Sequence, residues 1–247
     1  MLVQNIQELT LWHPTPIREL IGQGILYEGT KLLIFGGPKV FKSLLAQQLV
    51  LCLGSVSPLP QWLGHNILPT SSLTVQGELS RTLHRQRLLQ MAANYTLDPS
   101  RLPLFSTHFN LKLDTAIGMQ ELNTSLAKHR PQLLVIDPFY KFVSKRDEPT
   151  IVHFFDNIDK SIETYHITLV VIHHSRKSLL DSSGTVVDMG AQGIWGTRFI
   201  EGWFDSILEI KGDPGNDDRT LTFELRHARQ LHSPVTFTLD RKKLLLV

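Results

Sequence analysis

Residues 31–43 read KLLIFGGPKVFKS, and this stretch decides the fold. Its apolar beginning, 31–35, is typical of a buried strand, and a helix is expected to follow at once. Between them, Gly36, Lys42 and Ser43 stand at the spacing of the loop G-x-x-x-x-G-K-[ST]. In that loop, backbone N–H groups surround a phosphate, the lysine reaches the β- and γ-phosphates, and the hydroxyl ligates Mg²⁺. The predicted nucleotide contacts are Gly36, Gly37, Pro38, Lys39, Val40, Phe41, Lys42, Ser43 and Leu44.

Phe41 stands where the motif has its second glycine. Because the helix is expected to begin here, we expect a right-handed backbone with negative φ, which keeps the N–H aimed at phosphate without strain. The alternative for the whole segment is an ordinary glycine turn before a helix, and the pair Lys42-Ser43 argues against it.

The rest of the chain alternates short apolar runs with helical stretches, which predicts a mostly parallel sheet covered by helices on both faces. Further strands are expected at 72–76, 133–137 and 167–173, and helices at 43–52, 81–93, 115–129 and 151–165. After Gly196 the pattern predicts antiparallel strands at 206–211, 219–225, 235–239 and 243–247. We therefore expect one α/β domain over 1–247, with a lead-in at 1–30 and a strand extension at 205–247.

The composition fits a single large core, because 247 residues with 42% apolar content can bury one. A formal charge of +2 suits a phosphate-rich partner without requiring one. The single cysteine, Cys52, excludes an intrachain disulfide and suits a reducing compartment. The first residues lack a basic region followed by an apolar core, and no stretch approaches the ~20 apolar residues of a membrane span. These features predict a soluble cytoplasmic protein.

Two carboxylates follow predicted strands. Residues 133–137 read LLVID and deliver Asp137 to the carboxyl edge of the sheet, where open α/β sheets bind ligands. Such a run is common in α/β proteins, but with the phosphate loop upstream it predicts a Mg²⁺ position shared with Ser43. Glu78 follows 72–76 and can polarise an attacking water, although a glutamate favoured by a helix dipole is the alternative.

His173 and His174 end another predicted strand. An imidazole there can bind a γ-phosphate and report its loss, and a histidine pair satisfied within the fold is the alternative. No spacing among the eleven histidines resembles a zinc site.

Together these segments resemble the RepA-like branch of the RecA and DnaB superfamily, hexameric ATPases that move along single-stranded DNA. The matching pieces are Thr15-Pro16-Ile17 with Ile25, 36–43, GELS at 77–80, IDPFY at 136–140, VIHH at 171–174 and LRHAR at 225–229. The sequence departs from relatives at Phe41, and KRDEP at 145–149 lacks an asparagine that they often carry.

The resemblance implies a RecA-like core that binds ATP and Mg²⁺. In that core Lys42 contacts the phosphates, Glu78 is the catalytic base, and His174 or its neighbour His173 senses the γ-phosphate. It also implies a homo-oligomer, a hexameric ring, in which Arg226 or Arg229 of one subunit completes the next subunit's site.

In a ring of this type, the loops after the third and fourth strands face the central channel, and here they are 141–150 and 175–195. Their basic residues are candidate contacts for the backbone of single-stranded DNA: Lys141, Lys145, Arg146, Arg176 and Lys177. Trp195 and Trp203 can stack on bases, although burial is the commoner fate of tryptophan.

The leading hypothesis is thus an ATP-dependent single-stranded-DNA translocase or replicative helicase of plasmid or phage type. One alternative is a recombinase-like ATPase that forms filaments on single strands. Another is a nucleotide-gated DNA-binding regulatory module whose loop hardly hydrolyses ATP because of Phe41. A small-molecule kinase is disfavoured because no arginine-rich lid is visible beyond Arg81, Arg85 and Arg87.

Overall fold

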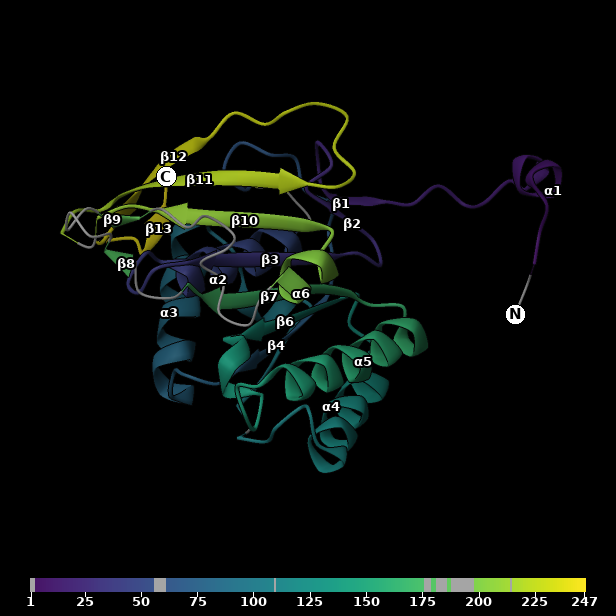
Figure 1. Ribbon diagram of the computed structural model, residues 1–247. Coiled ribbons are helices and arrows are strands. Elements are labelled where there is room, and N and C mark those ends of the chain that lie inside the picture. The colour runs from purple at the N-terminus through teal and green to yellow at the C-terminus, as the bar shows by residue number, and fades with distance from the viewer. Residues whose placement is uncertain are drawn as a thin grey trace.

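The computed structural model describes residues 3–55, 61–108, 110–175, 179–180, 186–187, 198–213 and 215–247. Within them, a nine-stranded sheet has the order β13-β12-β11-β10-β3-β7-β6-β4-β5 (Figure 1). Its parallel strands are β10 (Ser206–Lys211), β3 (Lys31–Gly36), β7 (Thr168–His174), β6 (Leu133–Asp137), β4 (Ser72–Gln76) and β5 (Leu104–Thr107). Its antiparallel strands are β11 (Asp218–Leu225), β12 (Val235–Asp240) and β13 (Leu245–Leu246). The expected parallel sheet with a C-terminal antiparallel extension is confirmed, except that β10, predicted among the antiparallel strands, runs parallel to β3 and antiparallel only to β11.

Helices cover both faces of the sheet, and each face has its own apolar core. One core contains α2 (Lys42–Gly54) and the buried side of α3 (Arg81–Asn94). The other contains α4 (Ala116–His129) and α5 (Glu148–Tyr165), which Figure 1 shows together on one side of the sheet. Because β3, β6 and β7 are buried on both sides, their sequences are nearly unbroken apolar runs.

The remaining elements are short. They are α1 (Ile6–Leu11), β1 (Glu19–Ile21), β2 (Leu26–Tyr27), η1 (Pro99–Arg101), η2 (Phe139–Lys141), β8 (Leu179–Leu180), β9 (Val186–Val187) and α6 (Arg198–Trp203). Figure 1 shows α1 standing apart from the sheet at the end of an extended segment. No helix of the described ranges is long and apolar enough to cross a membrane.

Several expected boundaries need correction. The predicted loop at 141–150 is shorter, because α5 begins at Glu148. The Asp147 side chain accepts a hydrogen bond from the Thr150 backbone N–H and caps the helix, and a proline lies in the first turn. The edge strand β5 was not predicted, since it is only four residues long and lacks a fully buried face.

Parallel register brings the carboxyl ends of four strands together. Gln76 at the end of β4 pairs with Asp137 of β6, and β6 lies beside β7. On the other side of β7, His174 pairs with Gly36 at the end of β3. The segments expected to carry chemistry therefore share one edge of the sheet.

We predict that Gly118→Ala destabilises the fold by about 1–3 kcal/mol, the usual cost of overpacking. A Cβ at this position in the first turn of α4 would overlap the backbone oxygen of Lys112. Urea unfolding measures the effect. The matched control is Gly202→Ala in α6, where a Cβ meets nothing within 4 Å. Equal stabilities for the two variants would contradict this account.

Candidate active site

The phosphate loop lies between the end of β3 and the start of α2. Gly36 has φ 155°, and a Cβ on it would overlap the carbonyl oxygen of Ile210 in the neighbouring strand β10. Only glycine allows this approach, so the first motif glycine is required by strand packing as well as by the turn.

The Lys42 side chain is folded back over the loop. Its Nζ donates hydrogen bonds to the carbonyl oxygens of Gly36 at 3.0 Å and Gly37 at 2.5 Å. Burial lowers the pKa of Lys42 to about 8, against the opposing effect of the carboxylates of Asp137 and Glu78. An ammonium ion deprived of water gains when an anion arrives, which is the property a phosphate-binding lysine needs.

The expectation for Phe41 was wrong. Its backbone is left-handed, with φ 72° and ψ 18°, immediately before the first residue of α2. The loop has to reverse here to enter the helix, a conformation that glycine adopts freely and that costs a side-chain-bearing residue about 1–2 kcal/mol. Lys39 is also left-handed, with φ 62°.

Arg219 supports the loop from β11, although nothing in the sequence pattern singled it out. The side chain is buried, and its guanidinium lies over the Phe41 ring, 4.3 Å from the centroid. Its Nη2 donates to the Lys39 carbonyl oxygen at 3.2 Å, and its Nη1 donates to those of Asp213 and Asn216 at 3.0 Å each. The cation therefore ties the phosphate loop to the turn between β10 and β11, and offsets part of the cost at Phe41.

Asp137 and Ser43, predicted as a pair, are in contact. Oδ1 of Asp137 accepts a hydrogen bond from Ser43 Oγ at 3.0 Å, and Oδ2 accepts one from Gln76 Nε2 at 3.1 Å. Burial raises the pKa of Asp137 to about 6, against these two hydrogen bonds. A buried carboxylate beside a hydroxyl is an oxygen donor set that Mg²⁺ prefers, so the residues fit this ion.

Gln76 is a second residue that sequence reasoning missed. Besides its bond to Asp137, its Oε1 accepts the backbone N–H groups of Glu78 at 2.8 Å and Leu79 at 3.1 Å. The side chain is buried, so these bonds exchange little with water. One amide thereby fixes the Asp137 carboxylate relative to the segment that carries Glu78.

The Glu78 carboxylate is held by two partners. Tyr140 donates its hydroxyl to Oε1, and His174 Nε2 lies 3.6 Å from the same oxygen. The contact with His174, helped by the hydrogen bond with Tyr140, lowers the pKa of Glu78 to about 2 against the opposing effect of burial. In this arrangement Glu78 is ionised and has a weak affinity for protons.

The two histidines have different surroundings. The His174 ring faces Glu78, whereas His173 is buried, with its ring edge against Phe139 at 5.2 Å between centroids. Nδ1 of His173 also accepts the backbone N–H of His174 at 2.9 Å. Of the predicted sensor pair, His174 is therefore the one placed beside the carboxylate.

The predicted arginine fingers lie at the opposite edge of the sheet. They follow β11, whose last residue Leu225 pairs with Ser206 at the beginning of β10. Arg226 is 3.3 Å from Asp205 and donates to the carbonyl oxygen of Gly202 at 3.0 Å. Arg229 lines a cavity beside the β1–β2 hairpin. Within one chain, neither side chain is near Lys42.

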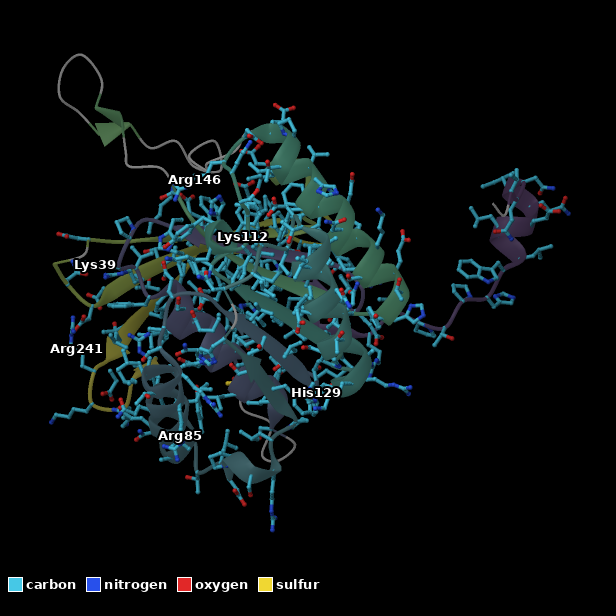
Figure 2. The ribbon with its side chains drawn as sticks, turned by 90° about the horizontal axis from the view of Figure 1, so that it is seen from below. Lys39, Arg85, Lys112, His129, Arg146 and Arg241 are labelled. Atoms are coloured by element: carbon cyan, nitrogen blue, oxygen red, sulfur yellow. The ribbon has the colours of Figure 1, made fainter. Side chains whose placement is uncertain are left out.

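The structure describes only part of the two predicted DNA-binding loops, 141–150 and 175–195. Lys145 and Arg146 are exposed, and Lys112 donates to the carbonyl oxygen of Lys141 at 2.5 Å. Lys112 and Arg146, both labelled in Figure 2, contact the adjacent residues Lys141 and Tyr140. Most of 175–195 lies outside the described residues, including Arg176, Lys177 and Trp195.

Trp203 follows the burial alternative. Its ring stacks on Phe155 at 3.9 Å, and its Nε1 donates to Asp159 at 2.8 Å. Lys31 Nζ lies over the same ring, 4.6 Å from its centroid. The Trp203 side chain is half-buried and its ring is engaged by these contacts, which fits packing better than stacking on bases.

A parallel sheet with this loop between strand and helix defines a RecA-like P-loop ATPase core. A family model described as an AAA domain matches residues 5–179, and the chain belongs to that family. The crystal structure of the RadB recombinase is similar, with a TM-score of 0.54 and 18% identity over 88% of this chain and 90% of that chain. At this identity the likeness concerns the fold alone. No curated protein matches the sequence significantly.

We predict that Arg219→Lys lowers affinity for Mg²⁺-ATP about ten-fold, because lysine keeps the charge but loses the planar fork that joins four carbonyl oxygens. Titration calorimetry measures this. The control is Arg18→Lys, whose pair with Glu28 precedes the start of β3, at the opposite end of that strand from the loop, and is worth little. Wild-type affinity in Arg219→Lys would show that the contacts of Arg219 with the phosphate loop do not shape the nucleotide site.

We predict that Asp137→Asn raises the melting temperature by a few degrees at pH 8 in EDTA. The native pKa of about 6 exceeds the ordinary 3.8, so wild-type stability declines as pH rises between these values. The penalty of at most about 3 kcal/mol is complete above pH 6 and absent below pH 4. Asparagine can keep both hydrogen bonds, since a serine hydroxyl also accepts.

Melting curves of Asp137→Asn and wild type at pH 8 and pH 4 test this. The stabilising difference should vanish at pH 4, where both side chains are neutral. A difference that is equal at both pH values would contradict burial of the charge as its cause.

Proposed function

We propose that this protein hydrolyses ATP at the carboxyl edge of its sheet and uses the hydrolysis on single-stranded DNA. The observation that carries the proposal is the convergence of Lys42, Ser43, Asp137 and Glu78 from three separate strand ends. Structural glycine turns or isolated helix-capping carboxylates give no reason for these four side chains to meet.

The chain's residues have distinct roles in this reaction. The backbone N–H groups of 37–43 and the Lys42 ammonium bind and orient the phosphates. Ser43 and Asp137 hold Mg²⁺, which neutralises phosphate charge when bound. Water attacks the γ-phosphorus, the bond to the β-γ bridging oxygen breaks, and Glu78 accepts the proton that the water loses. His174 contacts Glu78 and is placed to respond when the γ-phosphate leaves.

Single-stranded DNA is the proposed partner. Lys141 and Arg146 lie over the ring of Tyr140, which binds Glu78, and Lys112 donates to the Lys141 carbonyl oxygen. With the exposed Lys145, these basic residues can bind a phosphate backbone without reading sequence. The predicted loop at 175–195 remains part of this proposal. Because Arg226 and Arg229 lie at the far edge of the sheet, they can complete an ATP site only in a neighbouring copy. A homo-oligomer, in hexameric form, accounts for this placement.

Two forms of the activity remain. The RepA-like resemblance favours a translocase or replicative helicase that works as a ring. The alternative is a filament-forming recombinase, and one protein that shares this fold, the RadB recombinase, is named as a recombinase. Closed hexamers in ATP without DNA support the first form, and assemblies whose length grows with the DNA support the second. Electron microscopy with and without a thymidine oligonucleotide distinguishes them.

We predict Mg²⁺-dependent ATP hydrolysis that single-stranded DNA stimulates. Glu78→Gln should lower kcat by about 10²–10⁴-fold with little change in nucleotide affinity, the range expected for a general base. Lys42→Ala should weaken nucleotide binding itself. Steady-state hydrolysis and equilibrium binding separate the two effects.

The same measurements address the regulatory alternative. Tight binding of Mg²⁺-ATP without hydrolysis would exclude the enzyme and favour a nucleotide-gated module limited by the left-handed Phe41. Absence of both binding and hydrolysis would exclude the whole proposal.

A further inference from the structure

Tyr140 lies between Glu78 and the basic loop. Its hydroxyl donates to Glu78 Oε1, and its ring edge meets the His174 ring at 5.5 Å between centroids. Two cations lie over the Tyr140 ring: Lys141 Nζ is 5.5 Å and Arg146 Cζ is 5.4 Å from its centroid. One side chain therefore touches both the carboxylate and the cations that face solvent.

The backbone around Tyr140 packs directly on the segment before Glu78. A Cβ on Gly77 would lie 2.8 Å from the Phe142 ring and 2.9 Å from Lys141 Cβ. The Gly77 N–H also donates to the carbonyl oxygen of Asp137 at 2.8 Å. No side chain separates the two segments at this point, so a shift of 140–142 reaches Glu78 without an intermediate element.

A phosphate competes with Tyr140 for the cations. Charge-assisted hydrogen bonds from arginine or lysine to phosphate oxygens are stronger than a cation–π contact at an exposed ring. A DNA backbone on Lys141 and Arg146 should therefore draw these cations off the ring.

We propose that Tyr140 is a positioning residue that restrains Glu78 in the absence of DNA and releases it when a phosphate backbone occupies Lys141 and Arg146. The inference rests on the proposed ATPase function. With its Oε1 bound to the Tyr140 hydroxyl, Glu78 has fewer sites to accept a proton from water. Loss of this bond frees the oxygen and raises the proton affinity of the carboxylate, so that hydrolysis follows DNA binding.

Tyr140→Phe is the direct test, because it removes the hydroxyl and keeps the ring that packs beside His174. We expect kcat without DNA to rise on the order of ten-fold or more, the factor typical of one hydrogen bond to a charged group, with KM for ATP unchanged. Stimulation by a thymidine oligonucleotide should fall toward a ratio of one. A lower kcat without DNA, or an unchanged stimulation ratio, would overturn the role of Tyr140.

A matched pair of loop variants tests the cation side. Arg146→Gln removes a cation over the Tyr140 ring, whereas Lys145→Gln removes its exposed neighbour, for which the described residues show no contact with that ring. We expect Arg146→Gln to reduce maximal stimulation at saturating DNA. Lys145→Gln should only raise the DNA concentration needed for half stimulation. The same loss of maximal stimulation in both variants would overturn the proposed coupling of Arg146 to Glu78 through Tyr140.

The wild-type assay separates this inference from the proposed function. If the wild-type protein shows no Mg²⁺-dependent hydrolysis, both the proposed function and the inference about Tyr140 are wrong. If the wild-type protein hydrolyses ATP and responds to DNA, and Tyr140→Phe responds equally, only the inference about Tyr140 is wrong.

Discussion

A buried carboxylate lies at the centre of the described site. Asp137 is buried at the end of β6, where two neutral donors, Ser43 and Gln76, bind its oxygens. Ser43 belongs to the start of α2 and Gln76 to the end of β4, so this group joins three elements. Two neutral hydrogen bonds do not fully offset the loss of hydration, which leaves the site favourable to a cation. The phosphate loop, the Glu78 segment and the central strand depend on this contact for their mutual position.

Much of this arrangement could be predicted from local sequence. The apolar run 133–137 ends in Asp137, and the motif around Lys42 predicts a strand before it and a helix after it. Parallel strands place such ends at one edge, so the Ser43–Asp137 contact follows from two separate patterns. The positions that sequence reasoning missed depend instead on contacts across the chain. Gln76 looks like any polar strand end until its partners are known, and Arg219 looks like any basic strand residue.

Backbone conformation was the other feature that could not be predicted from the sequence. A negative φ at Phe41 was a reasonable expectation for a residue at a helix start, and the structure shows a left-handed one. The cost of that conformation is local, whereas the compensation comes from Arg219, far away in sequence. The location of Arg226 shows the same limit, because its strand was predicted but the direction of that strand relative to β3 decides which edge it reaches.

The contacts of Arg219 with the phosphate loop also have a consequence for the order in which the site forms during synthesis. The family match ends at residue 179, yet a support of the phosphate loop lies forty residues later, in β11. A nascent chain on the ribosome can pair β3, β4, β6 and β7 before β11 has left the exit tunnel. Its phosphate loop then lacks the cation over Phe41 and the anchor at Lys39. The nucleotide pocket is therefore completed only after β11 has emerged, later than the strands that form its floor.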